Sequence, residues 1–256
     1  MLDINKLVQA VTIVGCRVSG LMLFAPFLGS ASLPPRMKAG FSLLLIWLLA
    51  PLAVQNAATS SGLDWIRCSF GEFAVGLLLG LSVQLVFEAS LLAGQVLGVQ
   101  MGFSLVHVLD PQSQADTPVL SIFYQSIVIL LFLALDVPAL LLRGLAHSYI
   151  YLPAGSVVLN GAAVETLLAG VGGIFFAGIQ IAAPVLVATM VADIGLGFLG
   201  KASPQLPVLF VGLSIKSMLG MLILISAIAA WPRWFESAFG TAVIRGEHLL
   251  HLCQQR

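Results

Sequence analysis

The stretch that decides the fold of this chain is GEFAVGLLLGLSVQLVFEASLLAGQVLGVQMGFS, from Gly71 to Ser104. It predicts one long apolar helix within residues 70–104, which gives way to a polar break before the next apolar run. At a rise of ~1.5 Å per residue this helix is roughly 50 Å long, well beyond the ~30 Å hydrocarbon core of a bilayer. We therefore expect much of the helix to be covered by protein, as one part of a multi-subunit assembly.

The composition of the chain places it among helical membrane proteins. Hydrophobic residues make up 59% of the 256 residues and charged residues 9%, with a mean hydropathy of +1.07. A soluble domain usually carries about 25% charged residues, so this chain has too few to solvate a globular surface. Its formal net charge is zero, which removes the electrostatic case for binding nucleic acid.

The remaining apolar runs indicate an all-α, polytopic protein built of helical hairpins. Prolines lie in the breaks between the runs, where they end helices, and no alternation of apolar and polar residues typical of β-strands is sustained. Hydropathy alone suggests about six membrane spans, although the pattern also suits hairpins packed on other subunits. We treat residues 1–256 as one domain that ends in a tail of mixed character, 231–256. The runs are 7–28, 39–54, 70–104, 118–135, 137–151, 163–192 and 207–231.

The long predicted helix carries a stripe of small and polar residues. At 100° per residue, five glycines fall within a sector roughly 80° wide, and three polar side chains widen it to about 120°. Small residues let helices approach closely and amides hydrogen-bond across the contact, so the stripe predicts a packing seam against helices of partner subunits. The seam consists of Gly76, Gly80, Gln84, Glu88, Gly94, Gln95, Gly98 and Gly102.

Glu88 is a carboxylate inside a long apolar run, so it must be paired, neutral or in contact with water. We favour a hydrogen-bonded structural acid over a proton relay.

Residues that carry catalysis or bind metals are sparse. The spacing of Cys16, Cys68 and Cys253 suggests neither metal binding nor redox chemistry. His248 and His251 near the C-terminus are only a weak candidate for a metal site. Neither a catalytic motif nor a cofactor site is recognisable, and we expect no enzyme activity, no metal and no cofactor.

Several short motifs recur in a fixed order along the chain. Each is weak alone, because glycine and proline are common in membrane helices. The motifs are Arg17 with Phe24-Ala25-Pro26; Leu33-Pro34-Pro35-Arg36-Met37-Lys38; Gly71-Glu72 with Gly76 and Gly80; Ala93-Gly94, Gly98 and Gln100-Met101-Gly102-Phe103-Ser104 with Asp110-Pro111; Leu152-Pro153-Ala154-Gly155; and Ala183-Pro184, Asp193-Ile194-Gly195-Leu196-Gly197, Pro204-Gln205, Gly212 and Lys216-Ser217.

In this order and spacing, the chain resembles the FliR family, the export-gate subunits of flagellar and virulence type III secretion systems. The resemblance runs from Arg17 to about Gly220, and the Gln-Met-Gly-Phe-Ser form of the central block favours the flagellar branch.

The resemblance implies an export gate in the bacterial inner membrane, at the flagellar basal body. Helical hairpins of this subunit and of two smaller membrane subunits, of FliP and FliQ type, would form a closed spiral around a channel for unfolded flagellar proteins. An export-switch subunit of FlhB type would dock at the cytoplasmic mouth. A proton-driven subunit of FlhA type would supply energy.

The resemblance also implies that the polar break, residues 103–118, plugs this channel. Apolar side chains would form a constriction that blocks water, and the polar run from Gln112 to Asp116 gives a loop that can move aside. The residues expected in the plug are Phe103, Leu105, Val106, Val108, Leu109, Asp110 and Pro111.

Five of the charged residues in the family motifs are singled out as candidates for pairing. Charges inside membrane proteins usually pair, and we expect these to pair structurally between subunits rather than to transport ions. They are Arg17, Lys38, Glu72, Asp193 and Lys216.

Two alternatives to a flagellar gate stay open from the residues alone. The first is the gate subunit of a virulence secretion system. The second is a self-contained proton-coupled transporter that uses Glu88, Asp193 and Lys216 for coupling, although the sequence shows no internal repeat of the kind common in such proteins.

Overall fold

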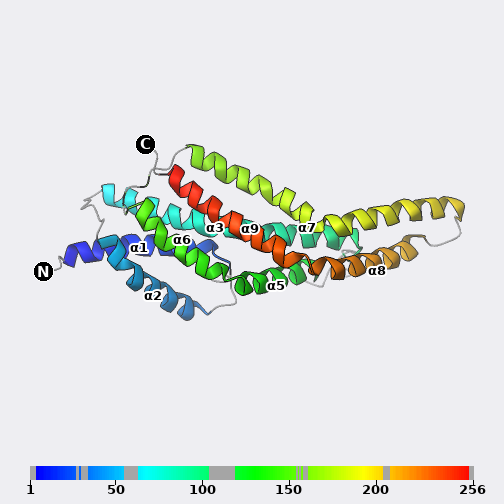
Figure 1. The fold of residues 1–256 in the computed structure, drawn as a ribbon, viewed down its shortest axis with the longest axis horizontal. Helices are drawn as coiled ribbons and strands as arrows, with labels where there is room; N and C mark the ends of the chain where they lie inside the picture. The colour runs from blue at the N-terminus through cyan, green and yellow to red at the C-terminus, as the bar shows by residue number, and fades with distance from the viewer. Residues whose placement is uncertain are drawn as a thin grey trace. The chain divides into compact units, whose positions relative to one another are not determined.

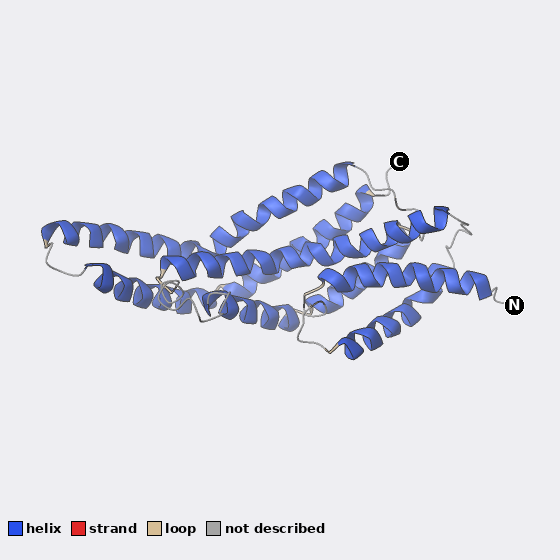
Figure 2. Cartoon of the chain, turned by 180° about the vertical axis from the view of Figure 1, so that it is seen from behind, coloured by secondary structure: helices blue, strands red, loops and turns tan. Residues whose placement is uncertain are grey.

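The computed structural model describes the chain as a set of helices. It covers residues 4–26, 29, 34–54, 63–103, 119–153, 155, 157, 161–203 and 208–253, and no strand occurs in these ranges (Figure 2). The predicted all-α fold is confirmed. The helices, labelled in Figure 1, are α1 (Ile4–Phe24), α2 (Pro35–Val54), α3 (Leu63–Gln100), α5 (Val119–Ala134), α6 (Val137–Tyr151), α7 (Gly161–Ala202), α8 (Val208–Ile228) and α9 (Trp231–Leu252).

The helices divide into two compact units. The first unit takes its described residues from 1–86, 132–172 and 238–256, and the second from 87–131 and 173–237. Helices α3 and α7 each contribute to both units. The single-domain organisation expected from the sequence stays a prediction.

The long helix α3 is the main structural element, as the sequence predicts, but its bounds differ. It begins at Leu63 and ends at Gln100, a length of 38 residues. Its end precedes the predicted one because Gly102 has φ +84°, a left-handed conformation that terminates helices. Within Trp65–Gln100, 61% of the residues are buried by the chain itself. Much of the protein cover expected for this helix therefore comes from its own chain.

The first unit packs α1, the first part of α3, α6 and the end of α9 around one core. Helix α2 contacts α1 and leaves large apolar side chains exposed, including Trp47 and Leu48. Buried apolar residues of this core include Val14, Val18, Leu21, Val75, Leu79, Leu145, Phe239 and Leu249.

Helix α9 occupies the region that the sequence suggests is a tail of mixed character. One side is buried in the chain, at positions such as Phe235 and Leu249, while Arg245 and His248 on the other side are exposed. The mixed composition is therefore the pattern of an amphipathic helix.

The second unit packs the second parts of α3 and α7 with α5, α8 and the start of α9. Tyr124 of α5 packs its ring against Trp231 of α9, with ring centroids 4.8 Å apart. Helices α7 and α8 expose large apolar side chains to the outside. These include Phe175, Phe176, Met190, Phe198, Met218, Leu222 and Ile225.

The number of helices that could span a membrane is smaller than the six expected. By length and apolar composition, the described residues provide four, or five if the bent pair α5–α6 counts as one span. The difference arises because α1 has only a short apolar segment, Val8–Phe24, and because α5 and α6 are separated at Asp136. Asp136 has φ 52°, a left-handed conformation in which Asp is one of the more common non-glycine residues.

Candidate functional site

The first polar cluster is a fully buried ion pair in the first unit. Arg17 of α1 donates from Nε to Glu72 Oε2 of α3 at 2.6 Å, and both side chains are 0% exposed. Arg17 also donates from Nη1 to Ser148 Oγ at 2.8 Å and from Nη2 to the Leu152 carbonyl at 3.1 Å. The Cζ atom of its guanidinium lies over the Tyr149 ring, 4.0 Å from the ring centroid. The charge of Arg17 is thus surrounded by partners from α3, α6 and the turn after α6.

The second member of this pair holds the same turn. Glu72 Oε1 accepts a hydrogen bond of 2.9 Å from the Gly155 backbone N–H. Gly155 has φ +87°, which favours glycine, and Cys68 of α3 lies beside it. Both charges of one ion pair therefore anchor the Leu152–Gly155 turn. The motif Leu-Pro-x-Gly marks this turn in the sequence, but its contact with the two charges is not predictable from the motif.

Glycines explain how α1 and α3 come close enough to form the pair. Gly76 follows Glu72 by one helical turn, and a Cβ there would collide with the backbone carbonyl of Arg17. A Cβ on Gly80 would lie 2.8 Å from the Leu21 carbonyl oxygen, and a Cβ on Gly20 would lie 2.9 Å from the Leu77 nitrogen. Side chains larger than hydrogen at these positions would separate the helices and the two charges.

The predicted glycine seam therefore has partners within the chain. Gly76 and Gly80 lie against α1, and a Cβ on Gly94 would lie 2.5 Å from the Ser121 Cα of α5. Gly98 is buried, Gln95 is exposed, and Gln84 and Glu88 are half-buried. Contact of this seam with partner subunits stays a prediction. Gly76, Gly80 and Gly94 cannot contact a partner subunit while they pack on α1 and α5.

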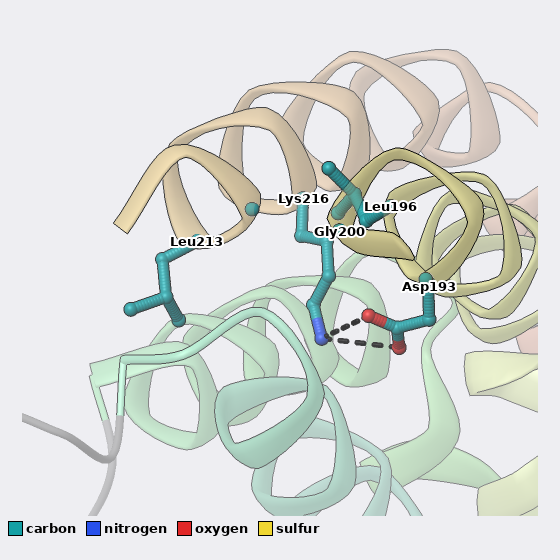
Figure 3. Close-up of a pocket in the computed structure, with 7 residues that line it drawn as sticks. Asp193, Leu196, Gly200, Leu213 and Lys216 are labelled. Atoms are coloured by element: carbon teal, nitrogen blue, oxygen red, sulfur yellow. Dashed lines mark hydrogen bonds and ion pairs between the residues drawn. The ribbon is translucent and has the colours of Figure 1, made fainter. Parts of the chain in front are cut away.

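The second polar cluster lies in the second unit, between α7 and α8. Lys216 Nζ lies 2.8 Å from Asp193 Oδ1 and 3.1 Å from Asp193 Oδ2 (Figure 3). Gln100 at the end of α3 donates from Nε2 to the same Oδ2 at 3.1 Å. The Asp193 side chain is 45% exposed and that of Lys216 is 17% exposed. This pair is therefore open on one side, unlike the pair in the first unit.

A cavity of about 330 Å³ adjoins this open pair. Figure 3 draws the residues that line it. Its walls are mostly apolar or glycine, and the pair supplies the polar atoms. The remaining lining residues are Leu196, Gly197, Gly200, Gly212 and Leu213.

The pairing of the family-motif charges differs from the sequence expectation in one respect. Arg17 pairs with Glu72, and Asp193 pairs with Lys216, so both pairs form within the chain and not between subunits. Lys38 donates to the Gly29 carbonyl at 3.2 Å. Sequence spacing could not assign these pairs, because 55 residues separate the partners in one and 23 in the other.

Most of the predicted plug falls outside the described residues. Phe103 is half-buried in the turn that follows α3, but Leu105, Val106, Val108, Leu109, Asp110 and Pro111 lie in the undescribed segment 104–118. Among the residues that are described, no group of three potential ligand side chains is arranged to hold a metal ion.

Comparison with known proteins decides the family. A family model described as "Bacterial export proteins, family 1" matches residues 8–242. The chain belongs to this family. The resemblance to FliR that the motifs predict is confirmed by relatives in distant bacteria, and the chain covers most of each relative.

Three flagellar biosynthetic proteins named FliR illustrate the extent of the similarity. That of Escherichia coli K12 is 29% identical over 205 residues, which cover 80% of this chain and 78% of the relative. That of Bacillus subtilis 168 is 28% identical over 228 residues, 88% of both chains. That of Caulobacter vibrioides is 27% identical over 222 residues, 85% of this chain and 87% of the relative.

Proposed function

We propose that this chain is a core subunit of a flagellar export gate. It would form the protein-conducting channel with two smaller membrane subunits of FliP and FliQ type and pass unfolded flagellar proteins across the bacterial inner membrane. The observation that carries the proposal is membership in the bacterial export family across residues 8–242, with curated relatives that are flagellar biosynthetic proteins.

The outer surface of the chain supports a role in an assembly. In the apolar segments Val164–Ala202 of α7 and Val211–Ile228 of α8, only 28% and 17% of the residues are buried. In Trp65–Gln100 of α3, 61% of the residues are buried. Asp193 is half-exposed among outward-facing apolar residues such as Ile194 and Phe198. A charge in apolar surroundings is costly unless protein or water covers it, so this part of α7 is better suited to a subunit contact or a wet channel than to lipid.

No step of catalysis is required of the subunit in this role. Arg17 and Glu72 are fully enclosed by their own chain, which suits a structural pair better than an active site. Energy for export would come from partners, namely the proton-driven subunit of FlhA type, and the export-switch subunit of FlhB type would bind at the cytoplasmic mouth. By the same analogy, residues 103–118 would close the channel at rest.

Deletion of the gene in the native host tests the flagellar assignment. The expected result is loss of hook and filament proteins from the culture medium, with recovery when the full-length chain is supplied in trans. Flagellar secretion that persists while secretion of virulence proteins stops would show that the chain serves a virulence system. Normal secretion of both kinds would contradict an export-gate role and favour a self-contained transporter.

A further inference from the structure

Helix α2 of the first unit presents one face to its own chain and leaves the opposite face uncovered. Leu45 and Leu49 are buried, and Ile46 approaches Gly15 of α1. Exposed positions recur at spacings of three and four residues, which places them on a single face of the helix. Only 11% of the residues of Pro35–Leu52 are buried. The large apolar side chains of the exposed face are Met37, Leu43, Leu44, Trp47, Leu48 and Leu52.

The composition of this face suits lipid better than a protein partner. Helices that pack on one another in membranes use small and polar residues at the contact. Helix α7 exposes such residues, among them Asp193, Gly195 and Gly197. On α2, by contrast, bulky side chains such as Trp47, which is 76% exposed, dominate the outward face. Pro35–Leu52 is 18 residues long and rises roughly 27 Å, close to the ~30 Å of a hydrocarbon core.

The charge around α2 is entirely positive in sequence. Residues 4–63 contain four basic side chains and neither Asp nor Glu. Of the four, Arg17 is neutralised by Glu72 in the buried ion pair. Arg36 and Lys38 both lie in the first turn of α2. The apolar face of this helix therefore has a pair of cations at one of its ends.

The position of the two cations matches the headgroup level of a bilayer. Arg36 is exposed, on the same side of α2 as the apolar face. Lys38 is half-buried and donates to the Gly29 carbonyl at 3.2 Å, which uses one of the three donors of its ammonium group. Long basic side chains at the end of an apolar helix extend to the headgroups while their stems stay among apolar groups. Anionic headgroups are favoured there over zwitterionic ones.

We propose that the outward face of α2 is a lipid-binding surface that lies against acyl chains, and that Arg36 and Lys38 at its start bind the headgroup of an anionic phospholipid. This site assigns α2 to the lipid-facing side of the subunit, whereas the glycines and Asp193 of α7 suit contact with protein or water. The inference holds whether the chain works inside an export gate or by itself, because it concerns only how the chain meets the bilayer.

Quenching of Trp47 fluorescence tests the contact with acyl chains. The native complex is extracted from its host and reconstituted in bilayers of phosphatidylglycerol and phosphatidylcholine whose acyl chains carry bromine, a short-range quencher. Trp47→Phe is the matched control, since it keeps the face apolar and its difference from the unchanged chain isolates the signal of this residue. The expected result is strong quenching of the Trp47 signal. A Trp47 signal that brominated lipid leaves unquenched would show that protein covers this face and would overturn the proposal.

Titration with phosphatidylglycerol, followed by native mass spectrometry, tests the headgroup site. Arg36→Gln combined with Lys38→Gln should raise the apparent dissociation constant of this lipid on the order of tenfold. Arg233→Gln combined with Arg245→Gln is the control, because it removes the same charge from exposed positions of α9 and should change little.

The exposed single variant Arg36→Gln repeats the test with minimal disturbance of the fold, at an expected change of about fivefold. Phosphatidylcholine binding should not change in any variant. Equal changes in the α2 and α9 variants, or no change in the α2 variants, would overturn the headgroup site.

Discussion

Arg17 Nε and Glu72 Oε2 lie 2.6 Å apart, and both side chains are completely buried between α1 and α3. The pair joins the first helix of the chain to the long central helix, and through Leu152 and Gly155 it also fixes the turn that follows α6. Because both charges are buried away from water, either residue without the other would leave an unpaired buried charge. The stability of the folded chain is therefore expected to depend on the two residues together.

Removal of one partner of this pair should destabilise the protein more than removal of both charges. Arg17→Met leaves the Glu72 carboxylate buried and unpaired, which typically costs about 3–5 kcal/mol. Adding Glu72→Gln neutralises that group while a side-chain carbonyl can still accept from Gly155. The double variant should therefore be more stable than Arg17→Met alone. Unfolding midpoints in one detergent measure this, and a double variant that loses the sum of the two single effects would show that the residues act independently.

The two kinds of glycine in the first unit should respond oppositely to alanine. Gly76→Ala places a methyl group against the Arg17 backbone carbonyl, so the helices must shift, at a cost of about 1–3 kcal/mol. At Gly172 of α7, no atom beyond the backbone of its own helix lies within 4 Å of the position that a methyl group would occupy, so Gly172→Ala is expected to stabilise its helix by roughly 0.5–1 kcal/mol. Chemical unfolding of the two variants measures both effects. Equal stability of the two variants would count against close α1–α3 packing.

A charge swap in the second unit separates a structural role for Asp193 and Lys216 from ion coupling. Lys216→Asp alone places two carboxylates together and should strongly reduce secretion of flagellar proteins. Asp193→Lys combined with Lys216→Asp restores opposite charges, so secretion should recover in part. Secretion assays that measure the single and double variants at matched protein levels decide the point. Complete loss of secretion in Asp193→Asn, with normal yield of the complex, would instead indicate proton coupling at this carboxylate.

A deletion tests the plug expected from the family resemblance. Removal of residues 106–114 should leave assembly intact but make the channel permeable to small ions, because the apolar constriction is lost. The measurement is membrane conductance in cells or vesicles that contain the assembled complex. Unchanged conductance with normal assembly would contradict the assignment of this segment as a plug.

The sequence predicts the helical class and the long central helix well, because apolar runs are a local signal. It places the start of α3 late, since residues 63–69 include the charged residues Asp64 and Arg67 and do not look apolar. It places the end late because the left-handed conformation of Gly102 is not encoded by hydropathy. The amphipathic pattern of α9, with Phe235 buried and Arg245 exposed, is present in the sequence and could have been recognised.

The polar clusters show the limit of sequence reasoning more clearly. Arg17 and Glu72 are visible as charges in family motifs, but only the fold brings them together across 55 residues. Ser148 and Tyr149, which complete the cluster, carry no motif signal of their own. The glycine stripe is visible from its helical spacing, yet spacing does not reveal that Gly76 and Gly94 pack on α1 and α5 of the same chain.

The central claim is that this chain works inside a mixed export-gate complex, and native mass spectrometry of the tagged protein, gently extracted from its own host, tests it most directly. The predicted result is a large complex that contains several copies of two smaller hydrophobic proteins. A monomer or homodimer that persists across mild detergents would contradict the claim and favour a self-contained transporter.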